Sequence, residues 1–255
     1  MTDDLKRPAL VAPSLRSLQI LQLVAEQSVP QTASEINATL GLPKATIHRM
    51  VGALEKEGYL ARDLDGRRYL PGPQLRDMML GVMRAGSYLA PRREVLARLN
   101  EAIGETCNLS IYDVDAMIYL DRVETRWPLR IALKVGSRVP LHATAAGKVA
   151  LAFMGGADFN TYLSKARLQR HTPATITDPA ALRAEIARVR KQGHSCDAEE
   201  FVPGMIAVAV PVTDGTGRLY ATLSFHAPLQ RLTLEKGLTH LPTLQAAAKD
   251  LGGLL

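Results

Sequence analysis

The sequence predicts an α+β protein of two domains. Helical periodicity recurs through residues 14–57, a Pro71-Gly72-Pro73 break follows, and helical and strand-like segments alternate after residue 91. A length of 255 residues slightly favours two domains over one, and 47% apolar with 22% charged residues is typical of a globular protein. We therefore expect a first domain over 1–72, ordered from about residue 14, a linker helix over 73–90, and a second domain over 91–255.

The first domain begins with two helical segments. Residues 14–26 place leucines mainly on one face, with Ser14 as the expected N-cap. Thr32 and Glu35 have the spacing of a capping box, and Gly41 is expected to end the short helix that follows. A third helix comes after a very short turn, so the order is that of a helix-turn-helix.

The third helix, from Pro43 to Glu57, has the pattern of one that reads DNA. Ile47, Val51 and Leu54 form an apolar stripe, and Pro43 suits the first turn. The outward-facing candidates for DNA contact are Lys44, Thr46, His48 and Arg49. Such side chains bond to phosphates or base edges, although an ordinary amphipathic surface helix would show a similar pattern.

A hairpin is expected between Tyr59 and Leu70, with its turn at Asp65-Gly66. A hairpin in this place is the wing of a winged helix-turn-helix, and Arg62, Arg67 and Arg68 are its candidate DNA contacts. The alternative is a solvated surface hairpin. Residues 1–76 carry ten Lys/Arg and eight Asp/Glu, a net charge of +2 out of +6 for the chain, so total charge does not single out this domain.

The expected linker helix carries an apolar stripe formed by Leu75, Met78, Met79, Val82 and Met83. Such a stripe more often packs on a neighbour than binds a cofactor. A second copy of the same helix would pair two DNA readers, which predicts a homodimer or tetramer.

The second domain is predicted to combine helices and an antiparallel sheet. The expected helices are 91–104, 143–154, 158–165, 179–192 and 238–251. The expected strands are 108–113, 117–123, 129–135, 194–199, 205–212 and 218–226.

The sequence gives little support for other chemistry. Cys107 and Cys196 are too few for a disulfide framework, and no His, Cys or Asp residues have the spacing of a metal site, so we expect no metal, cofactor or catalytic residue. The apolar run 205–212 is too short to cross a membrane, and the N-terminus lacks the apolar core of a secretory signal. A cytoplasmic location is expected.

Over nearly its whole length the chain resembles the IclR family of bacterial transcriptional regulators. The segments that carry the resemblance are SLRSLQILQLVAE, GLPKATIHRMVGALEKEGYL, GSRVPLHATAAGKVALAF, ITDPAALRAEIARVRKQGHSCDAEEFVPGM and IAVAVPVTDGTGRLYATLSFHAP. The resemblance implies a winged helix-turn-helix that binds a double-stranded operator and a GAF-like domain that binds an effector. It also implies dimers, often paired as tetramers, and small organic acids as effectors, without enzymatic activity.

The resemblance also implies the positions of the effector pocket. They fall on Ile131, Val139, Ala143 to Ala146 (Ala143, Ala145 and Ala146 above all), Asp197, Ala207, Ser224 and His226. The chain departs from the family at two of them, because many members have cysteine in place of Ala207 and serine in place of His226. These changes favour a bulkier acid, for instance an aromatic carboxylate, bonded by Ser224 and His226. The alternative is that His226 only fills space or bonds to a backbone carbonyl.

Two classes of function remain open at this stage. One is a regulator of a catabolic operon that responds to an acid. The other is a small-molecule-binding protein or enzyme in which the helix-turn-helix serves another role.

Overall fold

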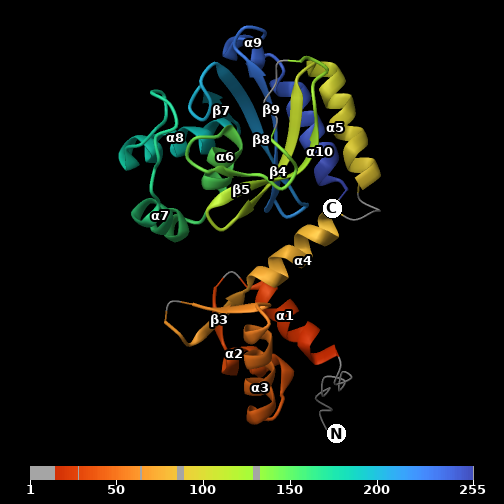
Figure 1. Ribbon diagram of the computed structural model, residues 1–255, viewed down its shortest axis with the longest axis vertical. Coiled ribbons are helices and arrows are strands. Elements are labelled where there is room, and N and C mark those ends of the chain that lie inside the picture. Colours follow the sequence, from red (N-terminus) through yellow and green to blue (C-terminus); the bar gives the residue numbers. More distant parts are fainter. Residues whose placement is uncertain (1–14, 28, 64, 85–88, 129–132, 255) are drawn as a thin grey trace, which may run out of the picture. The chain divides into compact units, whose positions relative to one another are not determined.

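The computed structural model describes residues 15–27, 29–63, 65–84, 89–128 and 133–254 of the chain (Figure 1). The chain divides into two compact units between Arg84 and Ala85.

The first unit contains four helices and a small sheet among its described residues. In chain order its elements are α1 (Arg16–Glu26), β1 (Gln31–Thr32), α2 (Ala33–Leu40), α3 (Lys44–Lys56), β2 (Leu60–Arg62), β3 (Arg68–Pro71) and α4 (Pro73–Arg84). The antiparallel sheet has the strand order β1-β3-β2. The helix-turn-helix and its wing are therefore present as predicted.

Local hydrogen bonds explain how α2 is joined to α3. The predicted capping box is confirmed: Glu35 donates its amide to Thr32 Oγ1 at 3.2 Å, and Thr32 donates its amide to Glu35 Oε2 at 2.7 Å. Gly41 caps the C-terminus with a φ of 62°, a left-handed conformation that glycine adopts without strain. Asn37 then clamps the turn, because its side chain both donates to the Leu42 carbonyl and accepts from the Leu42 amide.

The apolar faces of α1, α2 and α3 meet in one core with the sheet. The buried residues of this core are Ile20, Leu21, Val24, Ala33, Ile36, Ile47, Val51, Leu60 and Tyr69. Ile47 and Val51 lie on the inner face of α3, so the opposite face of that helix is left to solvent.

Three details of the first unit differ from the sequence prediction. Pro43 is the N-cap of α3 rather than part of its first turn, because its ψ of 137° is extended. The two-residue strand β1 was not predicted, since it is formed only by pairing with β3. Ser14, the expected cap of α1, lies outside the described residues, and Leu15 in the N-cap position provides no side-chain bond.

The second unit is built around a six-stranded antiparallel sheet. Its strands are β4 (Thr106–Asp113), β5 (Ala116–Val123), β6 (Arg138–Pro140), β7 (Ser195–Ala198), β8 (Met205–Thr213) and β9 (Leu219–Pro228), in the order β6-β5-β4-β9-β8-β7. Its helices are α5 (Leu89–Ile103), α6 (Ala145–Phe153), α7 (Gly156–Lys165), α8 (Pro179–Gln192), α9 (Leu234–Leu238) and α10 (Leu241–Gly252).

Helices cover both faces of this sheet (Figure 1). Helix α6 packs on one face with α8 against it, whereas α5 and α10 pack together on the other face. Alternation along the central strand β9 separates the two sides: Leu223 and Phe225 are fully buried, and Ser224 and His226 point toward the α6 side.

Two predictions for the second unit differ from the structure. Residues 129–132 lie outside the described residues and 133–135 form no strand, while β6 pairs with β5 a few residues later. Of the expected linker helix over 73–90, α4 accounts for Pro73–Arg84, residues 85–88 lie outside the described residues, and Leu89 belongs to α5. The closing helix is broken at Thr239 and His240, where Pro242 sets the first turn of α10.

Candidate functional site

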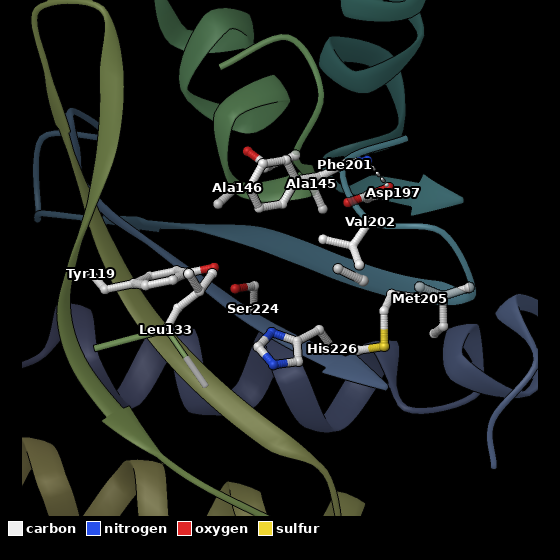
Figure 2. Close-up of a pocket in the computed structure, with 13 residues that line it drawn as sticks. Tyr119, Leu133, Ala145, Ala146, Asp197, Phe201, Val202, Met205, Ser224 and His226 are labelled. Carbon is white, nitrogen blue, oxygen red and sulfur yellow. Dashed lines mark hydrogen bonds between the residues drawn. The ribbon is translucent and has the colours of Figure 1, made fainter. Parts of the chain in front are cut away.

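A cavity lies between the N-terminus of α6 and the sheet in the second unit (Figure 2). Its lining residues are Tyr119, Leu133, Thr144, Ala145, Ala146, Asp197, Phe201, Val202, Met205, Ile206, Ala207, Ser224 and His226. The cavity volume is about 30 Å³, so the space is narrow.

Strand register brings distant parts of the chain to this cavity. Ala207 on β8 pairs with Asp197 on β7 and with His226 on β9, so the three residues form one row across the sheet. Because side chains alternate between faces, Ser224 lies on the same face two residues earlier. The predicted set is therefore assembled by sheet pairing across three strands.

The N-terminus of α6 forms the opposite wall. Thr144 caps the helix by accepting a bond from the Gly147 amide at 3.1 Å, and it donates its hydroxyl to the Pro140 carbonyl at 2.7 Å. The amides of Ala145 and Ala146 are first-turn donors, which have no acceptor within their own helix. This wall can therefore bind an anionic oxygen, aided by the helix dipole.

Asp197 is the carboxyl group of the cavity, and its side chain is almost fully buried. Its Oδ1 accepts bonds from the amides of Glu200, at 2.7 Å, and Phe201, at 3.4 Å. The pKa of Asp197 is raised to about 7, mainly by burial and in part by the nearby Glu200 carboxylate, against the lowering effects of the Glu200 and Phe201 amides and of Lys148. Near neutral pH this group can donate a hydrogen bond as well as accept one.

His226 is the second titratable group of the cavity. Its Nδ1 lies 3.2 Å from Nδ2 of Asn108, and its buried Nε2 has no hydrogen-bond partner among the described residues. Burial, helped by the charge of Arg122, lowers the pKa of His226 to about 3, so the imidazole is neutral. The alternative of a bond to a backbone carbonyl was wrong, because the partner is a side-chain amide.

Six of the nine predicted pocket residues line this cavity. They are Ala145, Ala146, Asp197, Ala207, Ser224 and His226. Val139 and Ala143 are buried in the adjoining core but do not line it, and Ile131 lies outside the described residues.

Sequence reasoning missed the remaining walls. Tyr119 comes from β5, and Phe201 and Val202 come from the loop after β7. Burial raises the pKa of Tyr119 to about 12, so its hydroxyl stays protonated and can donate. The alternating pattern of residues 117–123 predicts that Tyr119 lies on a buried face. The sequence near Tyr119 does not show which strand pairs with this one, so it does not place Tyr119 at the cavity.

In the first unit, the predicted DNA-contact residues of α3 lie on its solvent side. Lys44, His48 and Arg49 are exposed and Thr46 is half-buried. Among the described interactions, none ties the side chain of Lys44, His48 or Arg49 to the rest of the unit. These three side chains are thus available to bind a partner.

The three arginines of the wing differ in their surroundings. Arg62 donates to Glu55 at 2.7 Å, to the Gly66 carbonyl at 2.6 Å and to the Tyr69 hydroxyl at 2.9 Å. The Arg68 guanidinium lies 3.4 Å from an Asp65 oxygen, and the amides of both Arg67 and Arg68 donate to Asp65 Oδ1. Arg62 therefore holds the hairpin to α3, while Arg67 and Arg68 keep their guanidinium groups toward solvent.

Both cysteines, Cys107 and Cys196, lie in the described part of the chain. No group of three or more His, Cys, Asp or Glu side chains there could hold a metal ion, and both cysteines are unpaired and buried. Among the described helices, none is both long enough and apolar enough to span a membrane.

A winged helix-turn-helix with an exposed basic face, joined in one chain to a domain with a small enclosed cavity, defines a ligand-responsive transcriptional regulator. Family comparison agrees: residues 15–64 match the "IclR helix-turn-helix domain" and residues 89–252 match "Bacterial transcriptional regulator IclR C-terminal". The chain belongs to the IclR family.

Individual relatives extend along nearly the whole chain. The chain is 37% identical to the "Probable transcriptional regulator SauR" of Cupriavidus necator, over 94% of this chain and 95% of that protein. The crystal structure of the Thermotoga maritima IclR matches with a TM-score of 0.63 and 28% identity, covering 93% of this chain and 96% of that one. An IclR homolog from Microbacterium hydrocarbonoxydans complexed with 4-hydroxybenzoate matches with a TM-score of 0.60 and 27% identity, covering 95% and 98%. The Cupriavidus necator protein is named as a transcriptional regulator, and none of the three is named as an enzyme.

Proposed function

We propose that this chain binds a pseudo-palindromic operator as a homodimer or homotetramer and that a small organic acid, held in the cavity beside α6, controls this binding. The operator would belong to a catabolic operon whose substrate or product is that acid. The observation that carries the proposal is the cavity itself, in which first-turn helix amides face buried polar groups of the sheet. Because its ligand is operator DNA, we propose a cytoplasmic location.

The chemistry of the two walls supports a carboxylic acid. The amides of Ala145 and Ala146 suit a carboxylate, whereas Ser224 and His226 suit a second polar group. Tyr119 and Phe201 offer aromatic surface between them. We propose an aromatic or hydroxylated aromatic acid, and the solved homolog that holds 4-hydroxybenzoate is consistent with this choice.

The size of the cavity limits this proposal. A ring does not fit into a volume of about 30 Å³, so an aromatic acid would have to displace side chains at the wall. Met205 and Val202 are the natural candidates, since methionine in particular adapts to irregular gaps. An acid of two or three carbons would need less rearrangement.

On the DNA side, we propose that α3 enters the major groove with Lys44, Thr46, His48 and Arg49 toward the bases and phosphates. Arg67 and Arg68 on the wing would contact the backbone or the minor groove. Met78, Met79 and Val82 expose 46%, 44% and 62% of their surface on α4, and this apolar stripe supports pairing of two chains through the helix.

The test combines DNA binding with an acid screen. The full chain is incubated with DNA fragments taken from upstream of its neighbouring genes, over a series of salt concentrations, with and without each acid. We expect tight, sequence-selective binding that weakens steeply with salt and shifts with at least one acid. Weak binding that is indifferent to sequence at physiological salt would contradict the DNA proposal.

The contribution of His226 is tested in the same screen by thermal shift. The best acid should stabilise the wild type more than His226→Ala. Equal stabilisation of both proteins would remove His226 from the proposed contact.

A further inference from the structure

His226 has a buried neighbour that is not itself part of the cavity wall. Asn108, on β4, is fully buried, and its Nδ2 lies 3.2 Å from Nδ1 of His226. In the sheet, Asn108 stands directly between Arg122 on β5 and Ser224 on β9. The amide therefore contacts the Nδ1 edge of the imidazole, and Asn108 is not among the residues that line the cavity.

This contact determines which ring nitrogen carries the proton. An amide NH₂ group can only donate, so Nδ1 of His226 must accept with its lone pair. A neutral imidazole has one proton, which then sits on Nε2. Burial and the charge of Arg122 hold the pKa of His226 far below neutrality, so the doubly protonated ring does not compete.

The orientation of the amide is the one that places its NH₂ group against Nδ1 of His226. Its oxygen, Oδ1, is buried and has no hydrogen-bond partner among the described residues. Arg122, the residue opposite Asn108 on β5, donates its Nη1 to the Leu133 carbonyl.

The consequence is a donor without an acceptor. Nε2 of His226 is buried and has no partner among the described residues, and the 93% burial of the residue keeps bulk water from it. Figure 2 shows Ser224 and His226 across the cavity from Ala145 and Ala146. A ligand that fills the cavity without an oxygen at this place would leave the Nε2–H group unsatisfied. It should therefore bind more weakly than a ligand that carries such an oxygen.

We propose that Asn108 is a positioning residue that fixes His226 as an Nε2–H donor, and that the effector is a carboxylic acid with a second, accepting oxygen such as a hydroxyl, phenol or keto group. The inference rests on the proposed function for the carboxylate end of the ligand. It adds the direction of the second hydrogen bond, and hence a class of acids that the cavity selects.

The proton position is measured by NMR on the full-length protein labelled with ¹⁵N-histidine. The chain has six histidines, and His226→Gln assigns the signal of His226 by its loss. We expect the wild-type ring to show a protonated Nε2 and a bare Nδ1. In Asn108→Asp the carboxylate accepts instead, so Nδ1 should become protonated. A wild-type ring protonated at Nδ1 would overturn the role of Asn108.

Ligand selection is measured by calorimetry with pairs of acids that differ in one oxygen: 4-hydroxybenzoate against benzoate, and lactate against propionate. In the better-binding pair, we expect the oxygenated acid to bind the wild type about tenfold more tightly, the size of one hydrogen bond. Asn108→Leu, which removes the amide donor from Nδ1 without adding a charge, should weaken this preference while the affinity for the plain acid changes little.

Ser110→Ala is the matched control. Ser110 is fully buried on the same strand and lies two residues from Asn108, so its variant tests the effect of a nearby buried truncation. It should keep the preference, and unfolding temperatures show that each variant is folded. If the folded wild type binds both acids of a pair equally, the inferred selection for a second oxygen is overturned, while the proposed control by an organic acid stands. If no acid binds, the proposed control by organic acids fails, and the NMR result still decides the role of Asn108.

Discussion

Nζ of Lys148 lies 2.5 Å from Oε1 of Glu200, and both side chains are almost completely buried, with 1% and 9% of their surface exposed. Lys148 belongs to α6, whose N-terminus forms one wall of the cavity. Glu200 donates its amide to Asp197 on another wall. The lysine also bonds to Glu185 on α8 at 3.1 Å, so one buried cation joins three elements around the pocket.

Removing this cation should be costly for stability. In Lys148→Met the buried carboxylate of Glu200 loses its partner, and breaking a buried ion pair in this way costs about 3–5 kcal/mol. Denaturant unfolding measures the loss. The control is the double variant Lys148→Met/Glu200→Gln, which removes both charges and should recover much of the stability. A single variant as stable as the wild type would contradict the role given to this pair.

The pKa of Asp197 predicts a pH dependence of stability. Because burial raises that pKa to about 7, from 3.8, the folded chain keeps a proton that the unfolded chain has lost between these values. The free energy of unfolding should therefore fall as pH rises from about 4 to about 7 and then level off, by up to a few kcal/mol. Unfolding curves at several pH values measure this slope.

Asp197→Asn is the matched variant, since it keeps the shape and removes the titration. For this variant, the free energy of unfolding should no longer contain the fall between pH 4 and 7 that the titration of Asp197 causes. The same variant with an unchanged slope between pH 4 and 7 would show that Asp197 titrates as an ordinary surface carboxyl.

Elements with strong local signals were predictable from the sequence. Helix α8 runs from Pro179 to Gln192 as expected, because Asp178 caps its start and Gly193 ends it with a φ of 71°. The short helix α2 is likewise fixed by its capping box. In both cases the residues that set the ends lie within a few positions of the helix.

Features that depend on distant pairing were not predictable in the same way. Strand β6 has only three residues and exists because Arg138 to Pro140 pair with β5. The contact between Asn108 and His226 joins positions 118 residues apart through the pairing of β4 with β9. Six of the nine pocket residues that the resemblance implied line the cavity, but the contacts between their polar groups follow only from the strand register.

Arg49 is expected to read a base. It is exposed on the solvent side of α3, and no described interaction holds its side chain. Arg49→Ala should weaken specific operator binding by about 1–3 kcal/mol and relax the sequence preference at one position. Footprinting together with binding to single-base operator variants measures both effects. A loss that is the same on all sequences would indicate a phosphate contact instead.

The wing offers a pair of variants with different expected effects. Arg67→Ala should lower affinity for all sequences and reduce the slope of log affinity against log salt by about 1, since one phosphate contact is lost. Arg62→Ala should instead loosen the hairpin, because Arg62 joins Glu55, Gly66 and Tyr69. Arg62→Ala should therefore lower the melting temperature of the DNA-free protein, whereas Arg67→Ala should leave that temperature unchanged. A lower melting temperature for Arg67→Ala than for Arg62→Ala would reverse this assignment.

Gly147, in the first turn of α6, has no room for a side chain. A Cβ there would lie 2.3 Å from the carbonyl oxygen of Leu141 and 2.4 Å from its Cα, both of them backbone atoms that cannot turn aside. Gly147→Ala should therefore push the start of α6 away from the chain after β6. The free-energy cost of this shift should exceed the roughly 0.5–1 kcal/mol by which alanine stabilises a helix relative to glycine.

Gly52, within α3, is the matched control, because a Cβ there meets nothing within 4 Å. Gly52→Ala should stabilise the protein by about 0.5–1 kcal/mol. Gly147→Ala should destabilise it and also weaken acid binding, since the amides of Ala145 and Ala146 move with the helix. Unfolding curves and calorimetry with the best acid measure both effects. If Gly147→Ala were as stabilising as Gly52→Ala and bound the acid unchanged, the close packing of α6 on Leu141 would not be what positions the anion-binding wall.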